Sequence, residues 1–409
     1  MHSDDTGRAG MGMLPQLFKE RGKRKFMKRK KIVVFFSRGG GGHLSATDAL
    51  TGYFHGRYDI TAVNPFDDIL AHLDPMRKLS FDRLSGEDSY NFLIRRGWYQ
   101  LINIYACKFS AAYINRCVTH IRRQLHVYLE HQRPDLIVSL IPFINAPLAK
   151  AAQSLGIPFV ILPIDLDPET YLYGFNGSRH DQLFFAIPCE REEIKAKITS
   201  AGLPRENIRV TGYPVRPAFL LPSDPGKTRK SLGISPDRPV LLLLMGANGA
   251  KRAHQFAQLI ETIGVPAELL IVTGHNARLS ERLAKMPAAQ HVKRRVIGHT
   301  ERIDELMGAA DLLVTKSGPG TIFEALHSGL PMVVDATTRV IRWESMNIAF
   351  VEEHDLGVAL RRLSDLPHLI CRHLSDDAYR AGIRRKFAAF DNRLFRDEFS
   401  ALVQDIAGG

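Results

Sequence analysis

Short apolar runs that end in glycine turns limit how this chain can fold more than any other feature. Residues 312–314 form one such run, residues 317–320 turn the chain, and a helical pattern then continues to residue 328. Residues 31–36 repeat the arrangement, with four glycines at 39–42 and a helical pattern over 44–53. A strand-length apolar run followed by glycines and a helix predicts a strand–turn–helix unit.

The same alternation continues along most of the chain. Repeated strand–helix units favour parallel, doubly wound sheets, and a chain of 409 residues is too long for one ordinary core. We therefore predict an α/β protein with two Rossmann-like domains facing a cleft, over residues 32–213 and 214–377. The remaining apolar runs that support this are 60–63, 135–141, 158–163, 183–186 and 208–211 in the first domain, and 239–245, 268–273, 292–297 and 331–335 in the second.

The positive charge is concentrated at the start of the chain. Of the net charge of +12, residues 1–31 carry ten Lys/Arg against three Asp/Glu. Such a tail is typical of a disordered, solvated segment, and it could also dock on anionic lipid or bind nucleic acid without specificity. Because the remainder is nearly balanced, we expect no specific nucleic-acid partner.

Cysteine usage and hydropathy predict a cytoplasmic protein. The four cysteines show no metal-binding or CxxC spacing, which fits a reducing compartment. The sequence has neither a membrane-spanning apolar run nor a signal-peptide pattern before the basic segment. Any contact with a membrane should therefore be peripheral, on its cytoplasmic face.

The turn at residues 317–320 is a candidate phosphate site. Gly318 and Gly320 have no Cβ, so a ligand can approach their backbone, and a helix start offers unpaired N–H groups to an anion. Glu324 has two interpretations. It could accept hydrogen bonds from ribose hydroxyls, or it could complete a capping box with Thr321.

His43 is a candidate general base. It lies where the glycine turn enters the first helix, at the carboxyl edge of the first strand. A helix start disfavours a charged imidazole, so His43 should be neutral and able to take a proton. Alternatively, it caps its own helix. Asp165 and Asp167 follow another strand and could orient His43, act as the base, or serve as loop carboxylates.

Five segments in this order resemble the monogalactosyldiacylglycerol synthase and processive diacylglycerol glucosyltransferase family, GT-B glycosyltransferases of the family 28 type. These segments are residues 37–43, 212–217, 244–249, 298–311 and 314–331. The resemblance implies inverting transfer of a hexose from a UDP-sugar to a lipid, diacylglycerol above all, without a cofactor or metal ion. It also implies that residues 378–409 cross back onto the first domain, and that His43 deprotonates or orients the acceptor hydroxyl.

The donor site expected from the glycine turns and from the resemblance is extensive. The uracil is expected near residues 297–300. Trp343 stands where the family pattern before Glu344 and Asn347 has Gln, which leaves the transferred sugar undetermined. The expected donor residues are Gly41, Gly42, Arg216, Gly246, Asn248, Gly298, Ser317, Gly318, Pro319, Gly320, Thr321, Glu324, Glu344 and Asn347.

Residues 74–131 have two interpretations. Trp98, Ile102, Tyr105 and Phe109 recur at helical spacing among basic residues, which fits a core-facing helix with a basic outer face. The same pattern fits an interfacial helix lying in lipid headgroups. Two other functions also stay open at this point: a UDP-sugar epimerase or hydrolase of the same fold, and a non-catalytic binding protein for nucleotide sugar or nucleic acid.

Overall fold

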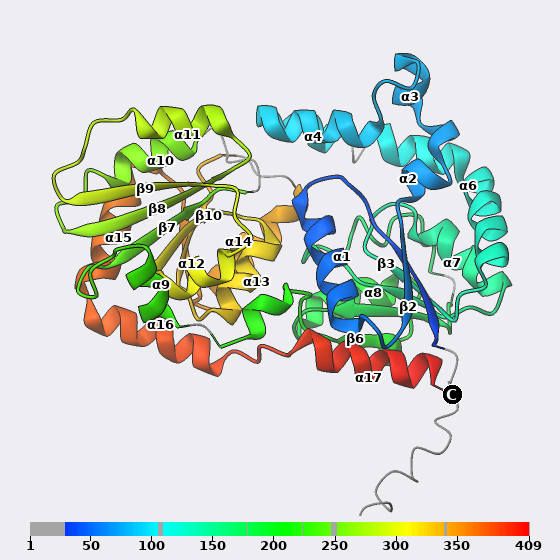
Figure 1. Cartoon of the computed structure of the whole chain (residues 1–409). Coiled ribbons are helices and arrows are strands. Elements are labelled where there is room, and N and C mark those ends of the chain that lie inside the picture. The colour runs from blue at the N-terminus through cyan, green and yellow to red at the C-terminus, as the bar shows by residue number, and fades with distance from the viewer. Residues whose placement is uncertain are drawn as a thin grey trace, which may run out of the picture.

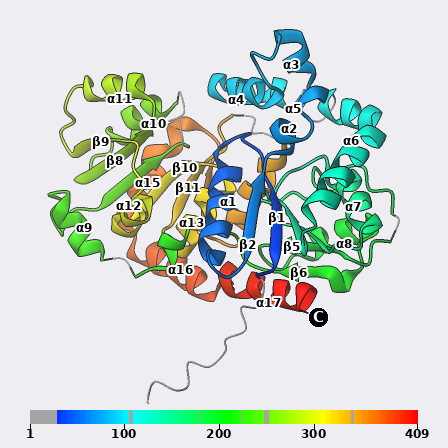
Figure 2. The same ribbon diagram turned by 45° about the vertical axis from the view of Figure 1, so that its right-hand side comes forward.

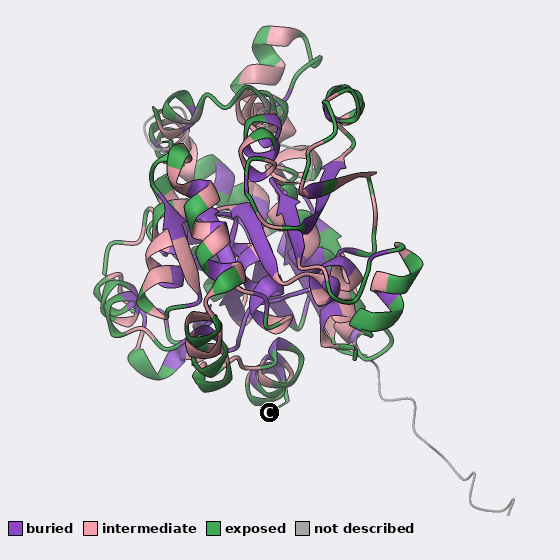
Figure 3. Cartoon of the chain, turned by 90° about the vertical axis from the view of Figure 1, so that its left-hand side faces the viewer, coloured by how far each residue is buried: buried purple, intermediate pink, exposed green. Residues whose placement is uncertain are grey.

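Two six-stranded parallel sheets, each flanked by helices, form the frame of the protein in a computed structural model (Figure 1). The structure describes residues 29–104, 109–177, 179–222, 224–246, 252–338 and 342–408. The inner strands are buried, because helices cover both faces of each sheet, whereas the edge strands 59–63 and 292–298 are only partly buried (Figure 3). Among the described residues, every helix is too short or too polar to span a bilayer.

The first sheet is built from residues 31–210 in the order β2-β1-β3-β4-β5-β6. Its strands are β1 (Lys31–Phe35), β2 (Asp59–Val63), β3 (Leu136–Ser139), β4 (Phe159–Ile161), β5 (Leu183–Ile187) and β6 (Ile208–Val210). The helices of this half are α1 (Gly41–Phe54), α2 (Pro65–Asp68), η1 (Ala71–Leu73), α3 (Pro75–Ser80), α4 (Gly86–Arg96), α5 (Tyr99–Ile104), α6 (Ala111–Gln132), α7 (Asn145–Ser154), α8 (Glu192–Ser200) and η3 (Arg205–Asn207).

The second sheet has the order β12-β11-β10-β7-β8-β9. Its strands are β7 (Val240–Leu244), β8 (Ala267–Gly274), β9 (Val292–Gly298), β10 (Leu312–Lys316), β11 (Met332–Asp335) and β12 (Gly357–Leu360). The helices of this half are η4 (Pro217–Leu220), α9 (Pro225–Ser231), α10 (Ala253–Ile260), α11 (Ala277–Ala284), α12 (Ile303–Ala309), α13 (Pro319–His327), η5 (Arg342–Glu344), α14 (Ser345–Glu353), η6 (Leu363–Asp365), α15 (Leu366–Ser375) and α16 (Asp377–Ala389).

Each sheet has one point where the direction of winding reverses. In the first sheet β1 lies between β2 and β3, and in the second β7 lies between β8 and β10. Ligands of open α/β sheets bind outside the carboxyl ends of the strands at such a switch point. The fold therefore marks two places for ligands: the loops that follow β1 and β3, and the loops that follow β7 and β10.

The two halves share one hydrophobic core. A single cluster of buried side chains includes Val34 of the first sheet, Tyr213 of the connector and Leu242 of the second sheet. The last helix, α17 (Phe395–Ala407), belongs to the same cluster, and its Phe399 packs on Phe54 of α1. The chain crosses between the halves twice, before η4 and before α17 (Figure 1).

Several expected boundaries differ from the structure. The first helix begins at Gly41 rather than at residue 44, and α13 begins at Pro319 rather than Thr321. The C-terminal stretch is two helices, of which α16 packs beside α15 while α17 reaches the first half. β12 was not anticipated, because its four residues are too short an apolar run to stand out.

The region from residue 74 to 131 is not one continuous helix face. Gly97, with a positive φ of 70°, ends α4, and α5 starts again at Tyr99. Ile102 is fully buried, whereas Trp98 and Phe109 are exposed. The core-facing interpretation therefore holds for Ile102 alone of the described residues in that pattern, and Tyr105 lies outside the described residues.

Candidate active site

His43 is the third residue of α1, directly after the turn that follows β1, and it is buried with 9% of its surface exposed. Its ring forms a hydrogen bond with the backbone of Leu140, the residue that follows β3. The Leu140 N–H already donates to Phe35, so the ring must donate to the Leu140 carbonyl. Nδ1 is buried and is hydrogen-bonded to no described residue. A neutral ring that donates one N–H keeps one unprotonated nitrogen with a lone pair.

Burial sets the charge of this imidazole. Removal from water lowers the pKa of His43 to about 4, and the hydrogen bond to Leu140 opposes this shift only in part. The side chain is therefore neutral at pH 7, as expected, but the main cause is burial rather than the helix start. The unprotonated nitrogen of a neutral histidine can accept a proton from a group brought next to it.

Asp165 and Asp167 have different environments in the loop after β4. Burial raises the pKa of Asp165 to about 8; Glu344 and Asp167 add to the rise, and Lys316 opposes it. Asp165 is therefore protonated at pH 7. Asp167 accepts the Glu169 backbone N–H at 3.0 Å and so closes its own loop. Neither carboxyl group is hydrogen-bonded to His43, whose described polar contact is with Leu140.

The turn after β10 is an uncapped helix start. Gly318 occupies the N-cap position of α13, and no side chain caps the helix. Pro319, at the first helical position, has no N–H, so Gly320 and Thr321 carry the first N–H groups without an intrahelical partner. An anion placed here would meet these N–H groups and the positive end of the helix dipole.

Lys316 lies between two glycine turns. A Cβ on Gly246, which has a φ of 98°, would lie 3.2 Å from Cε of Lys316, and a Cβ on Gly318 would lie 3.4 Å from the same atom. The Lys316 ammonium also pairs with Glu344 at 3.3 Å. The loops after β7 and β10 thus meet around one cation at the switch point. Asn248, in the expected donor set, lies outside the described residues.

The side chains of Glu344 and Asn347 stabilise the turn after β10 instead of lining an open surface. Glu344 accepts a hydrogen bond from the Ser317 hydroxyl at 3.0 Å. Asn347 is fully buried, and its amide donates to the Ser317 carbonyl at 2.9 Å. In this conformation Asn347 acts on a ligand only through the position of Ser317.

Glu324 is not a capping-box residue. The helix begins at Pro319, so Thr321 is not its cap, and Glu324 lies one turn further along α13. Its carboxylate accepts a hydrogen bond from Nε of Arg216 at 2.8 Å, across 108 residues of sequence. Burial raises the pKa of Glu324, while the Arg216 guanidinium opposes this shift. The capping interpretation is therefore wrong, and Glu324 is half of a largely buried ion pair.

Tyr213 and Ile164, which were not in the expected site, connect the two switch points. The Tyr213 hydroxyl donates to the Ile164 carbonyl at 3.0 Å, and its ring stacks on Phe323 of α13 with centroids 4.5 Å apart. A Cβ on Gly42 would lie 3.2 Å from the Ile164 side chain, and one on Gly320 would lie 3.8 Å from the Tyr213 hydroxyl. The loops bearing Gly42 and Gly320 thus face each other across these two side chains. Sequence offered no signal for Ile164 beyond its place after β4.

Gly298 ends β9 at the same edge of the second sheet. The residue after it, His299, stacks on His275, with ring centroids 4.0 Å apart. This pair covers the place where the uracil is expected, and that expectation remains a prediction. Within the described ranges, His, Cys, Asp and Glu side chains form no group of three that could hold a metal ion.

Comparison with known proteins agrees with this arrangement. A family model for monogalactosyldiacylglycerol (MGDG) synthase matches residues 43–215, and one for the glycosyltransferase family 28 C-terminal domain matches residues 240–338. The chain is 26% identical to a probable chloroplastic monogalactosyldiacylglycerol synthase of Glycine max, over 86% of this chain and 66% of that protein. It is 28% identical to the processive diacylglycerol beta-glucosyltransferase of Bacillus subtilis (strain 168), over 61% of this chain and 62% of that protein.

The fold has solved counterparts as well. The crystal structure of Acinetobacter baumannii MurG superposes with a TM-score of 0.61 and 14% identity, covering 92% of this chain and 99% of that one. The chain spans just under two thirds of the length of the plant relative. The two family models together match well over half of the chain, one in each half of a GT-B fold. The chain therefore belongs to the GT-B glycosyltransferase family of the monogalactosyldiacylglycerol synthases and processive diacylglycerol glucosyltransferases.

Proposed function

We propose that this protein transfers a hexose from a UDP-sugar to the hydroxyl group of a diacylglycerol-like lipid, with inversion at the anomeric carbon. The observation that carries the proposal is the meeting of two switch points. One carries the neutral imidazole of His43, and the other presents the uncapped start of α13. Ile164 and Tyr213 pack between them. A base on one side and an anion seat on the other suit displacement at a carbon between them.

Each group has a defined task in a single displacement. The lipid oxygen attacks the anomeric carbon, the bond from that carbon to the diphosphate oxygen breaks, and the lipid proton passes to the unprotonated ring nitrogen of His43. UDP leaves with the bonding electrons, and the first N–H groups of α13, Arg216 and Lys316 stabilise its charge. Glu324 accepts hydrogen bonds from the ribose, which keeps the expected donor role of that residue.

The lipid acceptor is supported by an exposed apolar surface around α3, α4 and α5, which lie together at one end of the molecule (Figure 2). We call it the apolar surface. Among the described residues, most of the exposed large apolar side chains lie on these neighbouring elements, and exposed apolar patches mark interaction sites. Its members are Leu79, Phe81, Leu84, Phe92, Trp98, Leu101, Ile104 and Phe109, and Lys78, Arg83, Arg96 and Arg116 are exposed near them.

Apolar side chains mixed with basic ones fit the boundary of an anionic bilayer, so we propose that this end of the protein docks on such a membrane. The basic tail would make a separate contact. Lys30, the second described residue, bonds to the Ala407 carbonyl in α17, at the end of the molecule away from α3 and α4 (Figure 1).

The test is product formation. Purified protein is incubated with UDP-glucose, UDP-galactose, UDP-glucuronate or UDP-N-acetylglucosamine and anionic vesicles with or without diacylglycerol, and UDP and lipid products are measured. We expect one donor to give a glycosylated lipid and UDP release that requires diacylglycerol. Release of UDP without lipid would indicate a hydrolase, and a changed sugar without a lipid product would indicate an epimerase.

His43→Ala separates chemistry from binding. Turnover should fall by about 10² to 10⁴, the usual effect of losing a general base, while UDP affinity stays within about twofold because most of the expected donor residues lie in the other half. His373→Ala is the control, since His373 is also buried and bonded to a backbone carbonyl, that of Asp311. Near-normal turnover in a folded His43→Ala protein would contradict the role of His43.

A further inference from the structure

Side chains of α4 hold in place the turn that precedes His43. Residues 36–40 link β1 to α1 without regular structure, and Gly40 has a φ of 81°. Gly40 is the N-cap of α1, and it has no side chain to cap the helix. The position of α1 therefore depends on what fixes the backbone of this turn.

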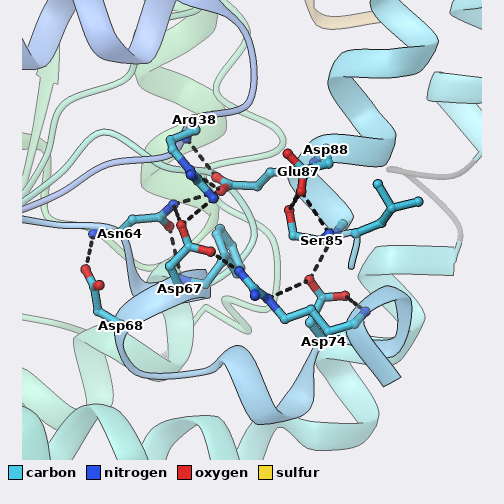
Figure 4. Close-up of polar contacts among 12 residues, drawn as sticks. Arg38, Asn64, Asp67, Asp68, Asp74, Ser85, Glu87 and Asp88 are labelled. Carbon is cyan, nitrogen blue, oxygen red and sulfur yellow. Dashed lines mark hydrogen bonds and ion pairs between the residues drawn. The ribbon is translucent and has the colours of Figure 1, made fainter. Parts of the chain in front are cut away.

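Glu87 of α4 fixes the start of the turn (Figure 4). One of its carboxylate oxygens accepts the backbone N–H of Arg38 at 2.8 Å and also the Ser37 hydroxyl. The other accepts the Asn64 side-chain amide at 2.7 Å and lies 3.5 Å from the Arg38 guanidinium. Glu87 thus ties α4 to the loops after β1 and β2, and both of its oxygens have partners.

Asn91, one helical turn further along α4, fixes the rest of the turn. Its carbonyl oxygen accepts the Gly40 N–H at 2.9 Å, and its amide donates to the Arg38 carbonyl at 2.9 Å. Tyr90 packs beside it, since a Cβ on Gly39 would lie 3.4 Å from the Tyr90 ring. Residues four apart on a helix share a face, so Glu87 and Asn91 present one polar face of α4 to the turn.

We infer that Glu87 and Asn91 are positioning residues for the reaction, holding the glycine turn so that His43 and the acceptor hydroxyl meet in one geometry. This inference deepens the proposed function and rests on it for the role of His43. Neither side chain bonds to His43 in the described structure; each acts on the backbone from which α1 starts. The same helix carries Phe92 of the apolar surface. The element that we propose to face the lipid is therefore also the element that places the base.

The variants that test this are Asn91→Leu and Glu87→Gln. Leucine keeps the size of Asn91 and removes both of its bonds to the turn. Glutamine removes the negative charge of Glu87 and replaces one of its two accepting oxygens, either the one bonded to Ser37 and the Arg38 N–H or the one bonded to Asn64, with a donor. Ser85→Ala is the matched control: the Ser85 hydroxyl caps α4 by accepting the Asp88 N–H at 3.1 Å, and it does not touch the turn. Ser85→Ala should weaken the start of α4, whereas only Asn91→Leu and Glu87→Gln should release residues 38–40.

Two measurements decide the question. In hydrogen exchange followed by mass spectrometry, the peptide covering residues 37–43 should exchange at least tenfold faster in Asn91→Leu and Glu87→Gln, and within twofold of wild type in Ser85→Ala. The lipid-dependent turnover number should fall at least tenfold in the first two variants and stay within twofold in the control. UDP affinity, measured by calorimetry, should stay within twofold throughout.

The outcomes that overturn the inference are distinct from those that overturn the proposed function. Unchanged exchange at residues 37–43 in Asn91→Leu would show that α4 does not hold the turn. Faster exchange with normal turnover would show that its position does not matter for transfer, and equal effects of Ser85→Ala would reduce Asn91 to a structural role. If the wild-type protein transfers no sugar to any lipid, the proposed function fails, and the exchange data still decide whether α4 holds the turn.

Discussion

Glu324→Gln tests the donor site most directly, because the structure separates its effect on folding from its effect on binding. The Glu324 side chain is 8% exposed, and it forms an ion pair with Arg216, whose side chain is 30% exposed. Glutamine keeps the length of the side chain and a carbonyl oxygen that can accept the Nε hydrogen of Arg216. It removes the negative charge, and with it the cost of burying that charge.

These facts set the expected magnitudes. Replacing a charge-assisted hydrogen bond by a neutral one should cost about 1 kcal/mol, and the lost burial penalty offsets part of this, so the free energy of unfolding should change by about 1 kcal/mol or less. In the donor complex the carboxylate would accept ribose hydroxyls through charged hydrogen bonds, worth about 1.5–3 kcal/mol each against about 0.5–1.5 for neutral ones. A loss of about 1–2 kcal/mol raises the UDP dissociation constant roughly 5- to 30-fold.

The assay is isothermal titration of UDP, with thermal unfolding measured on the same samples. Glu352→Gln is the control, because Glu352 pairs with Arg361 at 2.6 Å on the surface of the same half, and surface pairs contribute little. It should leave both UDP affinity and the melting temperature nearly unchanged. An unchanged UDP affinity in Glu324→Gln, with a clearly lowered melting temperature, would refute the donor role and make Glu324 a purely structural partner of Arg216.

Three further predictions concern the connector, the buried acid and the membrane. Gly212→Ala should destabilise the fold by at least ~2 kcal/mol more than Gly233→Ala, as measured by urea unfolding. Both glycines have a positive φ, but of the two only Gly212 would place a Cβ 2.2 Å from a backbone carbonyl oxygen, in the segment before α17. Equal losses of stability would contradict this. Burial raises the pKa of Asp165 to about 8 from its ordinary value of 3.8, so between these pH values the unfolded state binds fewer protons than the folded state and stability falls as the pH rises. Asp165→Asn should flatten that fall in melting temperature, and parallel curves for the two proteins would contradict the raised pKa. Deleting residues 1–28 should weaken sedimentation with anionic vesicles mainly at low salt. Trp98→Ser, in the apolar surface, should weaken it at every salt concentration. The reverse pattern would contradict the membrane contacts proposed for the basic tail and the apolar surface.

The sequence predicted the parts of the fold that depend on local pattern. β7 and β10 were expected within two residues, because their apolar runs end in glycine turns. The starts of α1 and α13 were placed too late, because the glycines before them were interpreted as turn residues although Gly41 and Gly320 already belong to helices. The break at Gly97 was missed because the apolar spacing continues on both sides of it.

The candidate site was predictable by residue type but not by partner. Arg216 and Glu324 were both expected near the donor, yet nothing in the sequence pairs residues 108 positions apart. The neutrality of His43 was expected, but its main cause, burial, depends on the packing of the first half. Glu87 and Asn91 were not expected at all, since an acidic and an amide residue on a polar helix face carry no signal until the fold brings the glycine turn beside them.

The two ion pairs at the second switch point indicate how the charged side chains of one site can be paired both with and without a bound ligand. Arg216 is paired with Glu324, and Lys316 with Glu344. His43 and Asp165 are both uncharged at pH 7, because their pKa values lie at about 4 and about 8. If UDP-sugar binds as proposed, its diphosphate takes over the two cations. The two carboxylates are then released to accept hydroxyl groups of the ribose and the hexose, which are the other polar groups that the donor brings. The four side chains would therefore exchange partners rather than change charge, so that donor binding leaves no charged group of the site without a partner.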